Sequence, residues 1–265
     1  MIPYTKCKKK RTMENTSWEK ASKWYGSIAS KEGHYFHRKI IFPALREIMD
    51  LKKTKDPSVL DLGCGPGAFA AQIPKNIPYC GVDLSRSLIR LAKKNNEKNR
   101  IFVQGDITKP LQIEKKDFSH AVFILSLQNV AKPDLAISQV KKHLRPNGKL
   151  ILVLNHPCFR IPRQTGWQID EAQKLQYRRV NHYMSPLKIP IQAHPGKEKE
   201  SVLWSYHFPI SSYFHFLKKS QFSVCDLQEW CSDKKSYGKK AKMENRARQE
   251  IPLFLTIVAN TKPHK

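Results

Sequence analysis

Short apolar runs alternate with amphipathic stretches between about residues 56 and 155. The apolar runs have the length of single strands and lie at residues 59–62, 79–82, 101–103, 120–125 and 149–154. Several of the stretches between them repeat their apolar positions at helical spacing, most clearly after Ser85, the expected N-cap of its helix, and after Pro133. Strands that alternate with helices build a parallel sheet covered on both faces. The pattern therefore predicts a doubly wound α/β fold.

The segments on either side of this core have different patterns. Helices are expected around residues 17–25 and 37–49, and the extreme N-terminus is expected to be disordered. After residue 155 the alternation stops until about residue 210, in a segment rich in Pro, His and aromatic side chains. An amphipathic stretch at residues 211–219 and strand-like runs at residues 222–227 and 253–259 follow.

A chain of 265 residues is expected to form one domain with additions. We predict an N-terminal helical extension over residues 1–55 and a main domain over 56–265, which includes a substrate-side insertion at 156–210 and a basic loop at 231–250. The insertion is interpreted either as a lid that recognises the substrate or as a small packed subdomain. The basic loop has seven Lys or Arg and three acidic residues, and is expected to be solvated and mobile.

A glycine-rich turn follows the first predicted strand. Its sequence is Asp61-Leu62-Gly63-Cys64-Gly65-Pro66-Gly67, and a short helix is expected at residues 68–71. Glycines permit positive φ values and let a ligand approach the backbone closely, so the turn predicts a nucleoside-like cofactor. Gly63, Gly65 and Ala68 also satisfy the looser dinucleotide fingerprint, which leaves a nicotinamide-dependent oxidoreductase as an alternative.

The same string, with an acid two positions before its first glycine, resembles motif I of the class I S-adenosylmethionine (SAM)-dependent methyltransferases. The resemblance extends from about residue 59 to 155. In that family an acid at the end of the second strand holds both ribose hydroxyls, and Asp83 fits this position, 22 residues after Asp61. A further acid after the third strand usually meets the adenine amino group, which Asp106 matches.

The resemblance implies SAM as the cofactor and a Rossmann-like, seven-stranded, doubly wound and mostly parallel sheet with a terminal antiparallel strand. N-terminal helices and a lid insertion after strand five complete the expected architecture. Asp61 either organises the glycine turn or reaches the ammonium group of the cofactor. The expected cofactor contacts are Asp61, Gly63, Cys64, Gly65, Gly67, Asp83, Leu84, Asp106, Ile107 and Ser126, with Tyr25 and His37 from the leading helices.

Methyl transfer from a sulfonium is a direct displacement, so the protein mainly aligns the acceptor, excludes water and, for a protonated acceptor, supplies a base. The acceptor is expected at the ends of strands four and five, near residues 126–129 and 155–159. His156 is the candidate base, against the alternative that it makes structural hydrogen bonds. Cys158 is interpreted as a small buried side chain rather than a nucleophile. An adenine-amino enzyme is not predicted, because the Asn/Asp-Pro-Pro-aromatic motif after strand four is absent.

Arginines and aromatic side chains gather in and around the insertion. Together they can stack on and neutralise an anionic or heteroaromatic acceptor. The candidate substrate contacts are Gln128, Phe159, Arg160, Arg163 and Trp167.

Composition adds a strong positive charge to this picture. The chain has 48 Lys and Arg against 22 Asp and Glu, a formal net charge of +26, which favours an anionic partner. RNA is slightly favoured over an anionic small molecule, although the excess of Lys over Arg is also explained by compositional bias. No apolar run approaches the ~20 residues of a membrane-spanning helix, and no apolar segment follows the basic N-terminus, so a cytoplasmic protein is expected. The six cysteines form no Cys-x-x-Cys pair, and no metal site is predicted.

Overall fold

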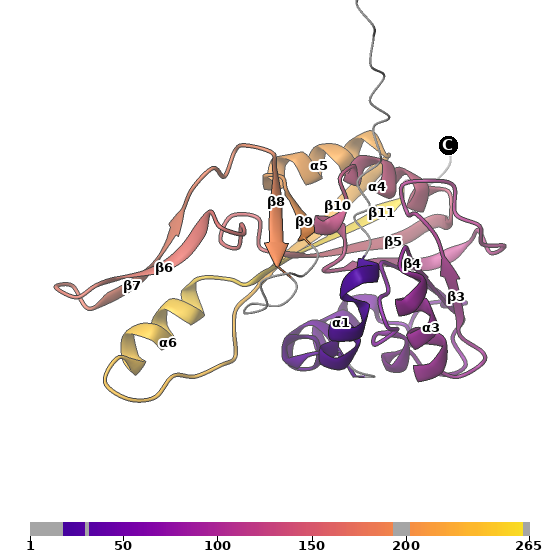
Figure 1. Ribbon diagram of the computed structural model, residues 1–265. Helices are drawn as coiled ribbons and strands as arrows, with labels where there is room; N and C mark the ends of the chain where they lie inside the picture. Colours follow the sequence, from indigo (N-terminus) through magenta and orange to yellow (C-terminus); the bar gives the residue numbers. More distant parts are fainter. Residues whose placement is uncertain (1–17, 30–31, 193–201, 262–265) are drawn as a thin grey trace, which may run out of the picture.

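The computed structural model describes residues 18–29, 32–192 and 202–261, with a seven-stranded sheet at its centre (Figure 1). The strand order is β10-β11-β5-β4-β1-β2-β3. From β5 to β3 all neighbours are parallel, whereas β11 runs antiparallel to both β5 and β10. The strands are β1 (Val59–Leu62), β2 (Tyr79–Asp83), β3 (Ile101–Gln104), β4 (Phe118–Ile124), β5 (Leu144–Asn155), β10 (Phe222–Trp230) and β11 (Phe254–Thr261). The predicted mostly parallel sheet with one antiparallel end is confirmed.

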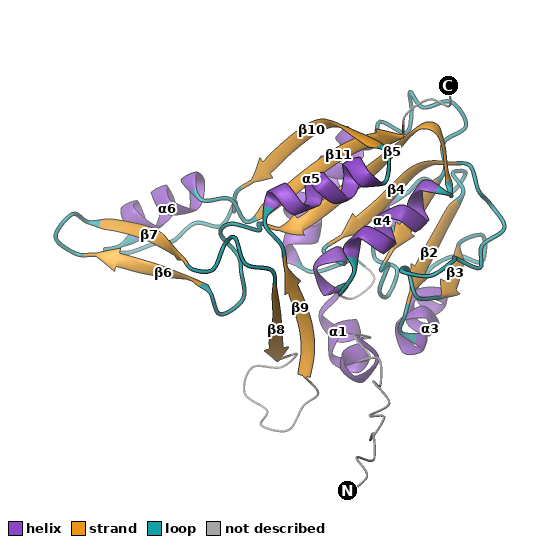
Figure 2. Ribbon diagram, turned by 90° about the horizontal axis from the view of Figure 1, so that it is seen from above, coloured by secondary structure: helices purple, strands orange, loops and turns teal. Residues whose placement is uncertain are grey.

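Two apolar layers cover the sheet, one on each face (Figure 2). On β5, Leu150, Leu152 and Leu154 pack in the layer that contains α4 (Pro133–Lys141) and α5 (Ile210–Lys219). The alternate residues Ile151 and Val153 pack in the layer that contains α2 (Phe42–Met49) and α3 (Arg86–Asn95). Both sets are completely buried, which explains why a central strand has a continuous apolar sequence.

The N-terminal helices lie where the sequence predicts them. They comprise the 3₁₀ turn η1 (Trp18–Ala21), α1 (Ser22–Ala29), the π-helical turn η2 (His37–Ile41) and α2. The predicted N-cap of α3 is also confirmed, since the Ser85 hydroxyl accepts a hydrogen bond from the Leu88 amide at 3.2 Å. The expected disorder of the extreme N-terminus concerns residues outside the described part of the chain.

The helix expected at residues 68–71 is reduced to a 3₁₀ turn, η3 (Ala70–Gln72). Pro74 explains the difference, because a proline disfavours helical backbone at the residue before it. Ile73 accordingly adopts an extended conformation, with φ −90° and ψ 130°.

The segment after β5 forms two antiparallel hairpins that go in different directions (Figure 2). The first pairs β6 (Thr165–Asp170) with β7 (Leu175–Val180) and projects away from the sheet. The second pairs β8 (Leu187–Gln192) with β9 (Val202–His207), and β9 contacts the short turn η4 (Leu127–Asn129) after β4. The described part of the segment is thus divided between two hairpins, and its interpretation as a lid or as a small packed subdomain stays a prediction.

The expectation that residues 231–250 form a basic loop is wrong for their second half, which folds as α6 (Ala241–Glu250). Met243 and Ala247, four residues apart, are buried on one side of this helix. The helix packs against β7, with Lys240 paired to Glu171 at 2.7 Å. We call the β6–β7 hairpin together with α6 the arm.

The described residues include no helix with the length and apolar content required to cross a membrane. The boundary predicted between residues 55 and 56 falls in the connection from α2 to β1. It stays a prediction, as do the boundaries of the substrate-side insertion.

Asp61 is a buried carboxyl group in the middle of β1. It is 2% exposed and accepts a hydrogen bond from the Tyr79 hydroxyl on the neighbouring β2 at 2.6 Å. Burial raises the pKa of Asp61 to about 7, which the Tyr79 hydrogen bond opposes and the nearby Asp83 reinforces. This carboxyl group therefore retains a proton in the folded chain at pH values where it is ionised in the unfolded chain.

We expect Asp61→Asn to make the free energy of unfolding rise more steeply with pH between about 4 and 7, because the substitution removes a contribution that falls in this range. Buried histidines such as His37 and His120, whose pKa values are lowered, contribute a rise over the same range. At Asp61 the folded state binds more protons than the unfolded state in this range, so this residue contributes a loss of up to roughly 1.4 kcal/mol per pH unit. Urea titrations between these pH values measure it. Asp226→Asn, a change on the exposed edge strand β10, serves as the control. Equal slopes for Asp61→Asn and the unaltered protein would contradict the expectation.

Candidate cofactor and acceptor site

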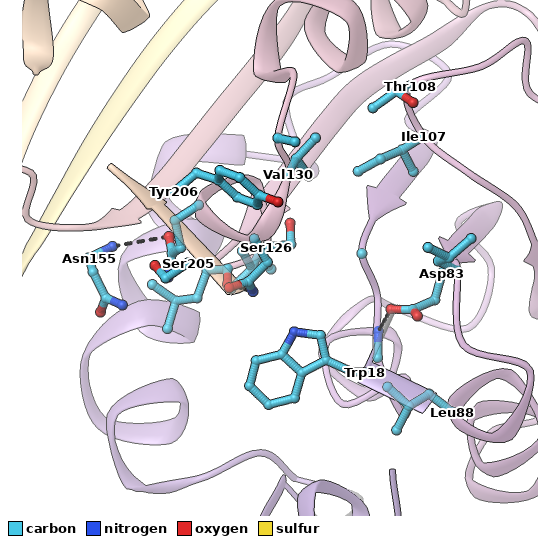
Figure 3. Close-up of a pocket in the computed structure, with 18 of the residues that line it drawn as sticks. Trp18, Asp83, Leu88, Ile107, Thr108, Ser126, Val130, Asn155, Ser205 and Tyr206 are labelled. Atoms are coloured by element: carbon cyan, nitrogen blue, oxygen red, sulfur yellow. Dashed lines mark hydrogen bonds between the residues drawn. The ribbon is translucent and has the colours of Figure 1, made fainter. Parts of the chain in front are cut away.

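A cavity of about 1100 Å³ lies at the carboxyl ends of the central strands (Figure 3). The chain passes from β1 outward through β2 and β3, and returns through β4 on the other side of β1. The connections that leave β1 and β4 therefore diverge, and a crevice opens between them. The β8–β9 hairpin and the N-terminal η1 and α1 supply further walls.

The glycine turn forms the floor of this cavity. Gly63 has φ 74°, and a Cβ atom there would lie 2.4 Å from the Cβ of Ser126, so no larger residue fits. The Ser126 hydroxyl in turn donates to the Leu62 carbonyl at 2.6 Å, which holds the loop after β4 against the turn. Gly65 has φ 54° and also lines the cavity. The expectation that backbone without side chains faces a ligand here fits this geometry.

Asp83 and Asp106 lie at the cavity wall after β2 and β3. The Asp83 oxygens accept from the Gly65 amide at 2.9 Å and the Ser85 amide at 2.8 Å, and the carboxylate faces the cavity (Figure 3). Burial raises the pKa of Asp83, while these amides oppose the shift. Partial burial opposes ionisation of Asp106 too, but hydrogen bonds from Thr108 and the charge of Lys109 lower its pKa. Each carboxylate oxygen has a second lone pair with which to accept from a ligand.

The N-terminal segment closes this end of the cavity through Glu19. Its carboxylate accepts from the Ser85 hydroxyl at 2.6 Å and from the hydroxyl and amide of Ser87 at 2.5 and 3.1 Å. These hydrogen bonds from Ser85 and Ser87 lower the pKa of Glu19 to about 2. The contact ties η1 to the start of α3, a favourable position for an anion, and places Trp18 on the cavity wall. Neither Trp18 nor Glu19 is among the site residues predicted from the sequence.

Four expected cofactor residues do not line the cavity. Asp61 is held by Tyr79 below the floor, and Cys64 is buried against Gly81. Gly67 faces α3. His37 is stacked between His34 and Phe42, with ring centroids 3.8 and 5.1 Å away, and burial lowers its pKa to about 3. The remaining expected contacts reach the cavity: Tyr25, Gly63, Gly65, Asp83, Leu84, Asp106, Ile107 and Ser126.

His156 does not lie in the cavity either, and both of its ring nitrogens are engaged. Nε2 lies 2.7 Å from a Glu229 carboxylate oxygen, and Nδ1 accepts from the amides of Cys158 and Phe159 at 3.1 and 3.4 Å. These contacts place the proton on Nε2 and leave no lone pair for a substrate. The geometry corrects the expectation of a base at this position and matches the structural alternative, in which the imidazole fixes the turn after β5.

The candidate substrate residues divide between the cavity and the outside. Gln128 and Arg160 line the cavity. Phe159 stacks on His156 at 4.8 Å between ring centroids, Arg163 is exposed, and Trp167 contacts Arg178 within the arm at 5.1 Å. The chain turns outward into β6 after the cavity wall, which separates Arg160 from Arg163 and Trp167.

The β8–β9 hairpin contributes cavity residues that are not among the predicted substrate contacts. Ser205 and Tyr206 of β9 and Ile191 of β8 line the acceptor side, near Asn155 and Val130 (Figure 3). A sequence signal exists, because residues 202–207 mix aromatic, aliphatic and hydroxyl side chains over the length of one strand.

The donor and acceptor groups of the cavity fit the expected cofactor. Asp83 and Asp106 supply anionic acceptors at successive strand ends for ribose hydroxyls and an adenine amino group. These two carboxylates give this end of the cavity the negative potential that suits a sulfonium and an ammonium group. A dinucleotide does not require the second acid.

A family model for a methyltransferase domain matches residues 53–184, about half of the chain. A malonyl-[acyl-carrier protein] O-methyltransferase from Halalkalibacterium halodurans is 25% identical over 232 residues, which are 79% of this chain and 81% of that protein.

Solved structures show the same relationship. A Listeria monocytogenes protein assigned as a SAM-dependent methyltransferase is 26% identical, with a TM-score of 0.61 over 83% of this chain and 99% of its own. A SAM-dependent methyltransferase from Mesorhizobium loti has the same fold, with a TM-score of 0.63, 21% identity, and coverage of 82% and 96%. The chain belongs to the SAM-dependent methyltransferases, enzymes with a Rossmann-like fold that take their methyl group from SAM.

Proposed function

We propose that this enzyme methylates a small-molecule acceptor that enters the cavity between β4, β5 and the β8–β9 hairpin. The observation that carries the proposal is the continuity of the cavity, which extends from Asp83 and Asp106 to Asn155 and Arg160. One end fits a nucleoside and the other leaves room for a second molecule. SAM, when bound, supplies an electrophilic methyl group on a sulfonium.

The residues proposed to hold the cofactor form its nucleoside end. Asp83 would accept from the ribose hydroxyls and Asp106 from the adenine amino group, because both are carboxylates with free lone pairs. The backbone of Gly63 and Gly65 would lie against the cofactor without an intervening Cβ. Trp18 covers the opposite side and excludes water.

The walls of the acceptor end favour a small molecule over RNA. They are formed largely by apolar and aromatic side chains, including Val130, Leu135, Ile191, Tyr206 and Phe254. The basic residues of the arm, which contribute to the preference for RNA drawn from charge, lie outside the cavity. The Halalkalibacterium relative is named for an acyl acceptor, which supports the same choice.

The proposed chemistry needs alignment more than it needs a reactive side chain. Neither His156 nor Cys158 lines the cavity, so no covalent intermediate is required of them. Ser126, Asn155 and Tyr206 offer polar groups that would orient an acceptor against the methyl group. The apolar walls would exclude water from the displacement.

We expect Asp83→Ala to weaken the binding of S-adenosylhomocysteine, the demethylated product, by about 10- to 100-fold. The variant loses charge-assisted hydrogen bonds worth ~1.5–3 kcal/mol. Isothermal titration calorimetry measures the change. Asp226→Ala on the exposed edge strand is the matched control, and circular dichroism verifies that both variants fold. Unchanged affinity in Asp83→Ala would refute the proposed cofactor site.

We expect label from methyl-labelled SAM to enter the metabolite fraction of a cell extract, or acyl groups that can be released from carrier protein in the protein fraction. Fractions of RNA, protein and metabolites are compared at about 50 and 200 mM salt. RNA bound through six phosphate contacts would lose affinity by a factor approaching ~10³ over this range, whereas a small acceptor would lose far less. Label confined to RNA, with this steep salt dependence, would overturn the small-molecule proposal.

A further inference from the structure

Arg160 presents a positive charge at the acceptor end of the cavity without a carboxylate to balance it. Its side chain follows the turn after β5 and lines the cavity. Within the described chain, its side chain makes one hydrogen bond, a long contact of 3.5 Å from Nη1 to the Leu253 carbonyl oxygen. The guanidinium carbon lies 5.2 Å from the centroid of the Phe254 ring. No described acid lies within ion-pair distance of it.

Burial and the nearby Arg178 both disfavour the charged form of Arg160. Burial, reinforced by the charge of Arg178, lowers the pKa of Arg160 to about 10. The charge of Arg160 in turn reinforces the effect of burial in lowering the pKa of His34, another lining residue. A partly buried charge without a partner costs free energy, and a bound anion would compensate it.

We propose that Arg160 forms a carboxylate-binding subsite, so that the acceptor of this enzyme carries a free carboxylate. The proposal rests on the proposed function, since it assigns the acceptor class of the same cavity. A guanidinium offers two parallel N–H donors, which match the two oxygens of one carboxylate. Lys109 and Lys132 also line the cavity, but Lys109 is paired with Asp106 at 3.6 Å and Lys132 is exposed on the connection from β4 to α4.

The position of Arg160 separates it from the nucleoside end. Asp83 ends β2, whereas Arg160 follows β5, and β1 and β4 lie between these strands. With neighbouring strands about 4.8 Å apart, the two strand ends are separated by roughly 14 Å. The subsite is therefore placed for the acceptor, and binding of the cofactor should not depend on it.

Malonate and its uncharged counterpart malonamide are the probes. We expect malonate to bind saturably to the protein loaded with S-adenosylhomocysteine, and malonamide not to bind. Arg160→Met keeps an unbranched apolar stem but removes the charge, and we expect it to weaken malonate binding by at least about 10-fold. Arg179→Gln, which removes an exposed charge on β7, is the matched control and should bind malonate as the unaltered protein does.

Thermal unfolding separates this role from a structural one. Arg160→Met without ligand should unfold at the same temperature as the unaltered protein or higher, because an uncompensated charge is removed. Malonate should raise the unfolding temperature of the unaltered protein and leave that of the variant unchanged. A lower unfolding temperature for the ligand-free variant would assign Arg160 a structural role and overturn the proposal.

Two further results would also overturn it. One is the absence of saturable malonate binding to the unaltered protein below about 10 mM. The other is a loss of S-adenosylhomocysteine affinity in Arg160→Met, which would show that the guanidinium holds the cofactor instead. Malonate is also titrated into protein without cofactor. If only the proposed cofactor site is wrong, malonate still binds and S-adenosylhomocysteine does not. If only the carboxylate subsite is wrong, S-adenosylhomocysteine binds and malonate does not.

Discussion

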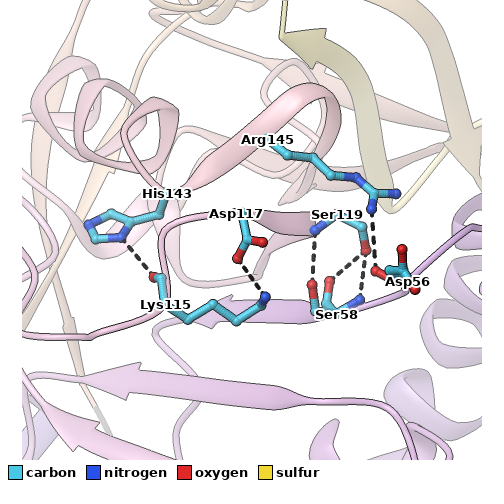
Figure 4. Close-up of polar contacts among 7 residues, drawn as sticks. All are labelled: Asp56, Ser58, Lys115, Asp117, Ser119, His143 and Arg145. Atoms are coloured by element: carbon cyan, nitrogen blue, oxygen red, sulfur yellow. Dashed lines mark hydrogen bonds and ion pairs between the residues drawn. The ribbon is translucent and has the colours of Figure 1, made fainter.

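The cavity of this protein lies where the strand order reverses, between β1 and β4. At their amino ends the two strands are held together by reciprocal serine contacts (Figure 4). The Ser58 amide donates to the Ser119 hydroxyl at 2.8 Å, and the Ser119 amide donates to the Ser58 hydroxyl at 3.1 Å. Arg145 adds a bond to the Asp56 carbonyl. These contacts hold the amino ends of β1 and β4 together. At the carboxyl ends the connections that leave the two strands diverge, and the crevice between them contains both the cofactor end and the acceptor end of the cavity.

The cavity carries opposite charge at its two ends. Asp83 and Asp106 are contributed by β2 and β3, while Arg160 is contributed by the turn after β5. Such a gradient would orient a sulfonium with its nucleoside and the proposed anionic acceptor toward each other. On this proposal total charge is a poor guide to the substrate, because the cationic group that would meet the acceptor is one partly buried side chain.

The core of the fold could be predicted from the sequence because buried parallel strands are continuous apolar runs and the glycine turn follows one of them. The positions of Asp83 and Asp106 could be predicted as well, because each follows the apolar run of a strand. His156 shows the limit, since its position at a strand end does not reveal that both ring nitrogens point into protein. Arg160 and Arg163 are three residues apart, and only the turn into β6 decides which one faces the cavity. In α6 the abundant charges concealed the apolar pair Met243 and Ala247.

The arm joins two segments that are far apart in the chain, and this has a consequence for its dynamics. The buried side of α6 packs against a hairpin that is only two strands wide, through contacts such as Lys240 with Glu171 and Arg246 with the Lys174 carbonyl. Neither piece has a core of its own. We therefore expect the hairpin and the helix to open and close as one cooperative unit, with amide hydrogens that exchange with solvent together while those of the central sheet stay protected.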